Sequence, residues 1–271
     1  MPGAKPPMLF FPGGHCSAAV DCGWSLYTSL GYGILSFSRP GYGSTSVGAL
    51  SAQEFVPAVK DSCSALGVSS TSGAVGVSFG GLQAIHVAVA APELVPRLAL
   101  HSCAPSTHAY PDTRRESLLG PIVFAPAVQH AVWAAISRLV GSDAGLRAMV
   151  GALSNRPLGD WWPGWSTADR DRARRLFRSM GSDAGFVNDL RQGRASSGAY
   201  RRFVQSQVRC PTFVTASRSD AGVAFRHALD LVRTIPTATL VELDAPSHLF
   251  WIGPTRPQVE RAVGTFLEAA V

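Results

Sequence analysis

The sequence has few charged side chains and no long apolar segment. Charged residues make up 15% of the 271 residues and hydrophobic residues 46%, a balance that supplies a large core and argues against disorder. No apolar run approaches the roughly 20 residues that a membrane-spanning helix needs. The opening MPGAKPPMLFFPGGHC has one lysine and a short apolar run, too little for a secretory signal. We therefore expect a cytoplasmic protein with no membrane partner.

Signals for paired cysteines, repeats and linkers are absent as well. The five cysteines are an odd number, and no two of them show the spacing of zinc ligands. We expect buried free thiols and no metal site, with a Cys16–Cys22 bridge as the one alternative. Without repeats or linkers, the length fits one large α/β domain or a core with an insertion.

Short apolar runs alternate with helical patterns over most of the chain, which is typical of a mostly parallel sheet with crossover helices. The expected strands occupy residues 8–11, 33–37, 74–77, 98–102, 212–215 and 239–243. The expected helices of this core occupy residues 20–30, 52–66, 79–91, 222–233 and 258–269. The fold class is therefore α/β, with about six strands in a twisted sheet flanked by helices.

The alternation stops after Cys103. Helical patterns follow at residues 125–139, 143–153, 167–180 and 184–191, without a convincing strand. We interpret residues 104–209 as an inserted helical cap, and residues 1–103 and 210–271 as the core. The cap holds 15 arginines against 8 acidic residues. A solvated arginine-rich face explains this excess better than nucleic-acid binding, because no nucleic-acid-binding motif accompanies it. The excess also suggests anionic substrates or an acidic carrier.

A serine between glycines stands where the third expected strand meets its helix. The pentapeptide GVSFG at residues 76–80 is the one G-x-S-x-G match in the chain, with Ser78 at its centre. A serine at such a turn is held in a strained backbone conformation, and its neighbours two positions away must lack side chains. The turn lifts the hydroxyl clear of the sheet. A glycine-rich turn that merely packs tightly is the alternative.

A serine hydroxyl is a weak nucleophile at neutral pH, so it needs a base, and the base needs an orienting acid. His248 follows the last expected strand, and Asp220 follows the strand before it. Loops at the carboxyl ends of parallel strands are where α/β sheets build their sites, and the ordinary pKa of histidine suits a base. We therefore predict a catalytic triad of Ser78, Asp220 and His248.

Backbone N–H groups must stabilise the negative oxygen that forms during acyl transfer. The N–H of Phe79, freed at the start of a helix, is the first expected donor. The segment FFPGGHCSA follows the first strand and supplies the second, for which Gly14 is preferred and His15 is the alternative. An ordinary turn at the exit of a strand is the other interpretation of this segment.

Four tryptophans are expected to shape an apolar substrate pocket. Trp161, Trp162 and Trp165 fall within six residues of the cap, and Trp251 lies three residues after His248. Tryptophans pack in cores and domain seams more often than they line pockets, so core packing of the cap tryptophans is the competing interpretation.

Together these segments resemble the α/β-hydrolase superfamily. FFPGGHCSA looks like its oxyanion loop, SFSRPGYGSTS like the loop after the next strand, and VGVSFGG like its nucleophile elbow. Asp220 and His248 fall where the family's acid and base would fall. The resemblance covers most of the chain apart from the cap. It implies an eight-stranded, mostly parallel sheet, a serine mechanism and no cofactor.

Two departures from the family pattern affect the expectations. The family usually has His-Gly where this chain has Pro12-Gly13, which leaves the choice of oxyanion donor open. The family also opens with an antiparallel hairpin, for which no residues precede the first strand near Met8. A sheet of about six strands with a barer edge follows, and a homodimer through that edge is one expectation. A start codon placed too far downstream explains the missing hairpin equally well.

The resulting prediction is a serine hydrolase that cleaves a small apolar or partly anionic carboxylic ester or lactone through an acyl-enzyme. A carbon–carbon bond hydrolase or lyase using the same triad is the first alternative. A small-molecule receptor that keeps the fold without catalysis is the second.

Overall fold

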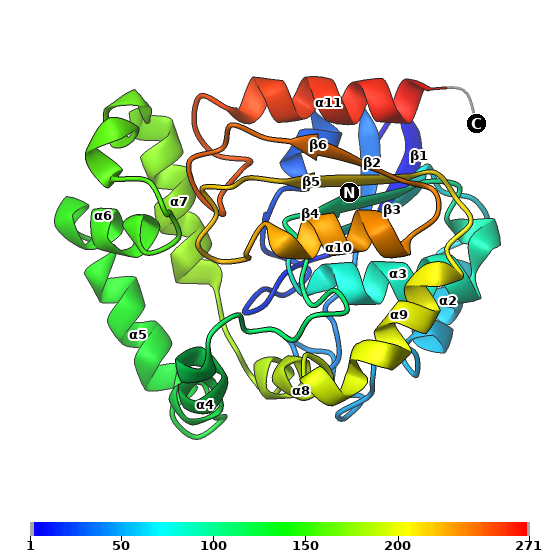
Figure 1. Ribbon diagram of the computed structural model, residues 1–271. Coiled ribbons are helices and arrows are strands. Elements are labelled where there is room, and N and C mark those ends of the chain that lie inside the picture. The colour runs from blue at the N-terminus through cyan, green and yellow to red at the C-terminus, as the bar shows by residue number, and fades with distance from the viewer. Residues whose placement is uncertain (1–2, 270–271) are drawn as a thin grey trace.

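A parallel six-stranded sheet forms the centre of the computed structural model, which describes residues 3–269 apart from the side chains of residues 114–116 (Figure 1). The strands are β1 (Lys5–Phe11), β2 (Tyr32–Ser36), β3 (Gly73–Val77), β4 (Leu98–His101), β5 (Thr212–Ala216) and β6 (Ala238–Glu242). They follow the order β2-β1-β3-β4-β5-β6, and each neighbouring pair is parallel. The predicted α/β fold and its six strands are confirmed. The sheet ends in β2 and β6, and a dimer through an edge stays a prediction.

Helices cover both faces of the sheet, and the alternation of side chains along β1 divides the core between them. The covering helices are α1 (Ser25–Thr28), α2 (Val56–Ala65), α3 (Gly80–Ala90), α10 (Arg226–Thr234) and α11 (Arg256–Glu268). Met8 and Phe10 pack with α1 and α11, whereas Leu9 and Phe11 pack with α2, α3 and α10. Figure 1 shows α11 on the opposite side of the sheet from α3 and α10.

The helix expected over residues 20–30 is wrong over most of its length, because only α1 is helical. The carboxylate of Asp21 accepts hydrogen bonds from the N–H groups of Gly23 at 3.0 Å and Ser25 at 3.2 Å. Gly23 also takes a φ of 117°, which no α-helix contains. Aspartate competes with helix in this way by offering the backbone a local partner.

The segment between β4 and β5, residues 102–211, is called the insert below. It contains α4 (Arg114–Val123), α5 (Gln129–Leu139), α6 (Asp143–Gly151), α7 (Thr167–Ser179), α8 (Gly185–Gln192) and α9 (Gly198–Ser206), of which α4 and α9 were not predicted. Short 3₁₀ helices occupy Pro92–Leu94, Leu158–Asp160, Trp162–Gly164 and Ala195–Ser197. Within the insert α5 and α6 contact α7, and α4 contacts α8, whereas α9 packs on α3 and α10. The division into core and cap at residues 104–209 stays an interpretation.

All five cysteines are free thiols, so the alternative of a Cys16–Cys22 bridge is not formed. Among the helices of the described residues, none has the length and apolar character needed to cross a membrane.

A buried histidine joins the sheet to the helical layer of α1. His101, at the end of β4, has Nε2 2.7 Å from the hydroxyl of Tyr27 and Nδ1 2.7 Å from the hydroxyl of Thr215. The side chain is fully buried, and burial lowers its pKa to about 3. His101 therefore stays neutral over the range in which an exposed histidine takes up a proton.

Because His101 is buried and neutral, we expect the protein to lose stability in mild acid. Below its ordinary pKa of 6.5, His101 is protonated in the unfolded chain but not in the folded protein, so protons favour unfolding. Each pH unit between about 6 and 4.5 should lower the free energy of unfolding by about 1.4 kcal/mol for this group. Urea unfolding of wild type and His101→Gln at several pH values measures the slope. In this pH range, the free energy of unfolding of the variant should change less steeply with pH, by the equivalent of about one proton. An unchanged slope would show that His101 is not held neutral in the folded protein.

Candidate active site

Ser78 occupies the turn between β3 and α3 in the conformation that its glycines permit. Its φ is 52°, in the left-handed region that residues other than glycine rarely adopt. A Cβ on Gly76 would lie 2.5 Å from the Cα of Gly81, and one on Gly80 would lie 1.9 Å from the carbonyl oxygen of Phe11. Both positions therefore require glycine for steric reasons, and the strained turn predicted from the sequence is present.

His248 and Asp220 lie on the loops after β6 and β5 and form a hydrogen-bonded pair. His248 Nδ1 is 2.8 Å from Asp220 Oδ2. The other carboxylate oxygen accepts from the N–H groups of Gly222 at 2.7 Å and Val223 at 2.9 Å, which fixes the carboxylate. A Cβ on Gly222 would lie 2.9 Å from Cγ of His248, so a glycine is needed beneath the imidazole.

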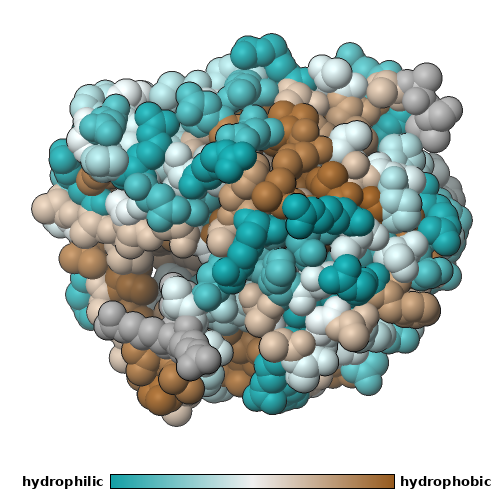
Figure 2. Space-filling view, in the orientation of Figure 1, coloured by the Kyte–Doolittle hydropathy of each residue, from teal (hydrophilic) through white to brown (hydrophobic). Residues whose placement is uncertain are grey.

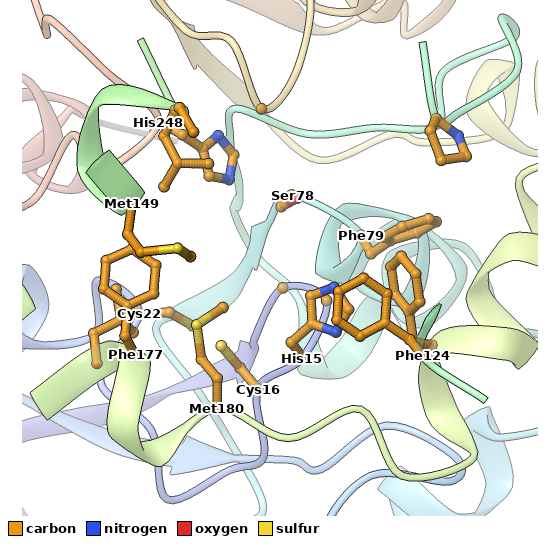
Figure 3. Close-up of a pocket in the computed structure, with 18 of the residues that line it drawn as sticks. His15, Cys16, Cys22, Ser78, Phe79, Phe124, Met149, Phe177, Met180 and His248 are labelled. Atoms are coloured by element: carbon orange, nitrogen blue, oxygen red, sulfur yellow. The ribbon is translucent and has the colours of Figure 1, made fainter. Parts of the chain in front are cut away.

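The electrostatics of the pair favour the protonated ring. Burial lowers the pKa of His248, but the charge of Asp220 and its hydrogen bond raise it by more, so the net pKa lies above the ordinary 6.5. With Nδ1 donating to the carboxylate, the neutral ring carries its lone pair on Nε2. Figure 3 shows the imidazole of His248 beside Ser78 at one cavity.

The insert holds both of these loops by backbone contacts. The carbonyl oxygen of Leu153 accepts from the N–H groups of Ala221 at 3.2 Å and His248 at 3.0 Å. Asn155 donates from its side-chain amide to the carbonyl oxygen of Asp220 at 2.9 Å. One short stretch of the insert therefore contacts both the loop of the acid and the loop of the histidine.

The cavity beside Ser78 has a volume of about 730 Å³ and a mostly apolar wall. Its wall includes Phe79, Leu119, Phe124, Trp133, Phe177 and Trp251. Among the described side chains, no aspartate, glutamate, lysine or arginine lines it. Near it, Leu118 and Ile122 of α4 are exposed, and Figure 2 shows hydrophobic surface gathered over that helix. Across the described residues, no three metal-ligating side chains are grouped to hold an ion.

The three cap tryptophans do not line this cavity, which corrects the expectation for Trp161, Trp162 and Trp165. They are buried in the core and contact one another, with ring centroids 5.4 to 6.5 Å apart. Trp162 and Trp165 stack, and Trp161 meets both edge to face. The guanidinium groups of Arg147 and Arg170 lie 5.6 and 5.0 Å from the centre of the Trp162 ring. The indoles contact each other and arginines, so they act as a packing seam, and the alternative weighed from the sequence holds for them.

The loop after β1, predicted to be the oxyanion loop, lies directly against Ser78. A Cβ on Gly13 would lie 3.1 Å from Cβ of Ser78, so the loop backbone approaches the serine closely. Within the described residues, the N–H groups of Phe79 and Gly14 have no hydrogen-bond acceptor. The N–H of His15, in contrast, donates to the hydroxyl of Tyr42 at 3.4 Å. Two free donors therefore stand beside the serine.

A buried arginine fixes the loop that carries these donors. Arg39 donates from Nε to the carbonyl oxygen of Pro12 at 2.9 Å and from Nη2 to that of Gly13 at 3.0 Å. Its guanidinium pairs with both carboxylate oxygens of Asp189 on α8, one of them at 2.8 Å, and Tyr42 donates to the same carboxylate at 2.6 Å. Burial lowers the pKa of Arg39, but Asp189 raises it by more, so the guanidinium stays charged.

The parallel sheet, the serine elbow and the placement of the histidine and the acid define a member of the α/β-hydrolase superfamily, and the comparisons with known proteins agree. No protein-family model matches the chain. It is 30% identical over 277 residues to the uncharacterized hydrolase YcgS of Bacillus subtilis strain 168, over 98% of this chain and 93% of the relative. The chain belongs to the α/β-hydrolase superfamily.

Solved structures share the fold at lower identity. An α/β-hydrolase fold protein from Nakamurella multipartita matches with a TM-score of 0.71 and 22% identity, over 98% of this chain and 93% of that one. The enol-lactonase from Burkholderia xenovorans LB400 matches with a TM-score of 0.62 and 18% identity, over the same shares of the two chains. At these identities the likeness concerns the fold alone.

We expect substitutions in the Arg39–Asp189 pair to have large and non-additive effects on the free energy of unfolding. Arg39→Met leaves a buried carboxylate unpaired and should lower the free energy of unfolding by about 3–5 kcal/mol. The double variant Arg39→Met, Asp189→Leu removes both charges, so it should lose much less than the sum of the single changes. Chemical denaturation measures all three variants.

An exposed pair provides the matched control. Lys60 and Glu93 are 3.2 Å apart with both side chains about half exposed, so Lys60→Met should cost about 1 kcal/mol or less. Additive losses in the Arg39 series, or a loss no larger than that of the control, would show that the buried pair is not coupled.

Proposed function

We propose that this member of the superfamily is a serine hydrolase of carboxylic esters, including lactones. The observation that carries the proposal is the His248–Asp220 pair, which faces the same cavity as the strained Ser78. A nucleophile, a base and an orienting acid in this order are the parts that acyl transfer needs. The family relationship to a protein described as a hydrolase supports the reaction class.

The proposed reaction has two halves. Ser78 Oγ attacks the ester carbonyl carbon while His248 Nε2 takes the hydroxyl proton, and Asp220 stabilises the imidazolium that forms. The carbon–oxygen bond to the alcohol then breaks, and the alcohol leaves with the proton from His248. Water attacks the acyl-enzyme with the same histidine as base, which releases the acid and restores Ser78.

The N–H groups of Phe79 and Gly14 are the proposed oxyanion donors. Of the two candidates in the loop, Gly14 is favoured, because the N–H of His15 already donates to Tyr42. Arg39 supports the choice. In a trans peptide the C=O and N–H point in opposite directions, so the grip of Arg39 on the Gly13 carbonyl directs the Gly14 N–H away from the guanidinium. Preorganised donors of this kind lower the barrier because they need no reorientation during the reaction.

The apolar cavity favours a neutral substrate. Burying a carboxylate without a partner is costly, and among the described side chains the wall offers no lysine or arginine to compensate it. The charge of a protonated His248 is already paired with Asp220. We therefore propose that the substrate is uncharged and that the arginine excess of the insert serves its solvated surface. Of the apolar or partly anionic substrates expected from the sequence, only the apolar class is proposed further.

Removal of the nucleophile is the first test. Ser78→Ala should lower hydrolysis of short 4-nitrophenyl esters at least about a thousandfold, because the serine acts with its base as a unit. Its free energy of unfolding should change by less than about 1 kcal/mol. A fluorophosphonate probe should label wild type at Ser78 and leave the variant unlabelled. If wild type is not labelled, the protein is better explained as a small-molecule receptor without catalysis. If Ser78 is labelled but no ester is hydrolysed, a carbon–carbon bond hydrolase or lyase is favoured.

The acid limb of the pH profile is the second test. For a neutral ester, kcat/KM should fall as the pH is lowered through the pKa of His248 in the free enzyme, because only the neutral ring is a base. The midpoint should lie above 6.5. Asp220→Asn removes the charge that raises this pKa, so it should move the midpoint downward and lower kcat. A wild-type midpoint below 6.5 would contradict the role of the pair.

A further inference from the structure

His15 holds an unusual backbone conformation at the wall of the cavity. Its φ is 62°, in a region that favours glycine or asparagine, and its carbonyl oxygen accepts from the N–H of Gly181 at 2.8 Å. Strained residues of this kind gather at functional sites, where their side chains are needed in one position. The mechanism proposed above uses neither nitrogen of the His15 ring.

The ring lies among aromatic side chains. Its centroid is 4.0 Å from that of Phe186, 4.5 Å from that of Phe124 and 5.1 Å from that of Trp133. Figure 3 shows His15 next to Phe124 on the side of the cavity below Ser78. The aromatic neighbours restrict the ring, so the nitrogen that does not face Ser182 has a fixed direction.

The hydrogen bonds of Ser182 assign the tautomer of His15. The hydroxyl of Ser182 is fully buried and has two partners, Trp133 Nε1 at 2.8 Å and His15 Nδ1 at 2.8 Å. An indole N–H can only donate, so the serine oxygen accepts from Trp133. The serine proton then has one acceptor among the described residues, which is Nδ1. His15 Nδ1 therefore accepts, and the proton of the neutral ring is on Nε2.

The ring is also held neutral. Burial and the charge of Arg39 lower its pKa to about 3. Nε2 has no hydrogen-bond partner within the described residues, and His15 lines the cavity. A neutral ring with an unpartnered N–H therefore lies at a mostly apolar wall.

We propose that His15 Nε2–H recognises an uncharged oxygen acceptor of the substrate, a carbonyl, ether or hydroxyl oxygen carried in addition to the reacting ester. This inference rests on the proposed function and specifies its substrate class. A hydrocarbon against Nε2–H would leave a buried donor unpaired, which is costly, so the enzyme should discriminate against it. A carboxylate would lose its hydration without gaining a cation.

Paired substrates and one variant test the proposal. The substrates are 4-nitrophenyl esters of equal chain length in which one methylene is replaced by an ether oxygen or a ketone at successive positions. His15→Phe keeps a flat ring and removes the donor. Comparing the kcat/KM ratio of oxygenated to hydrocarbon ester between wild type and variant cancels the intrinsic reactivity of each ester. At one position wild type should favour the oxygenated ester at least about tenfold, and the variant should not.

Trp133→Phe is the matched control from the same aromatic group. It removes the indole donor to Ser182 but leaves the serine hydroxyl as the donor to Nδ1, so the preference for the oxygenated ester should persist, whatever the overall rate. If no position is favoured over the hydrocarbon, or if His15→Phe keeps the preference, the proposal is wrong.

Nitrogen NMR tests the tautomer without turnover and without a variant of His15. In the wild-type protein, the ring ¹⁵N shifts should show a protonated Nε2 and an unprotonated Nδ1. Titration of Ser78→Ala with a neutral alkyl ketone should move the Nε2–H resonance, and an unprotonated Nε2 or an unmoved resonance would overturn the proposal. Failure of the proposed function is distinguishable, because wild type would then hydrolyse neither kind of ester.

Discussion

The ion pair between Arg39 and Asp189 is the contact on which the geometry of the site depends. Arg39 follows β2 and holds the carbonyl groups of the oxyanion loop, while Asp189 belongs to α8 of the insert. Two buried charges in this arrangement are strongly destabilising when separated, so core and insert must meet in one register. Gly14 has no side chain that could orient its N–H group. The direction of this N–H is set through the Gly13 carbonyl by Arg39, and thus by the contact between core and insert.

The insert therefore takes part in the site as a scaffold. It supplies the carboxylate that holds Arg39, the Leu153 carbonyl that joins the acid and histidine loops, and the Ser182 hydroxyl that orients His15. Each of these contacts uses a polar atom with a defined direction, so together they fix angles that apolar packing alone leaves loose.

The sheet and the elbow were predictable because their signals are local. Alternating apolar runs located all six strands, and the glycines around Ser78 announced a turn whose sterics the structure reproduces. The helix predicted over residues 20–30 was wrong over most of its length because Asp21 and Gly23 form turns. The sequence of the tryptophan cluster did not show whether the indoles would line a cavity or pack against each other. Arg39 lies in a segment that resembles the family, but its carboxylate partner Asp189 is 150 residues away, which spacing cannot show.

The dependence of the predicted oxyanion loop on α8 limits how segments of this fold can be exchanged. An exchanged insert would have to place a carboxylate where Asp189 lies, because the buried arginine behind the loop would otherwise lose its counter-ion. Point changes in the cavity wall, such as at Phe124 or Trp133, alter the lining while leaving this ion pair in place.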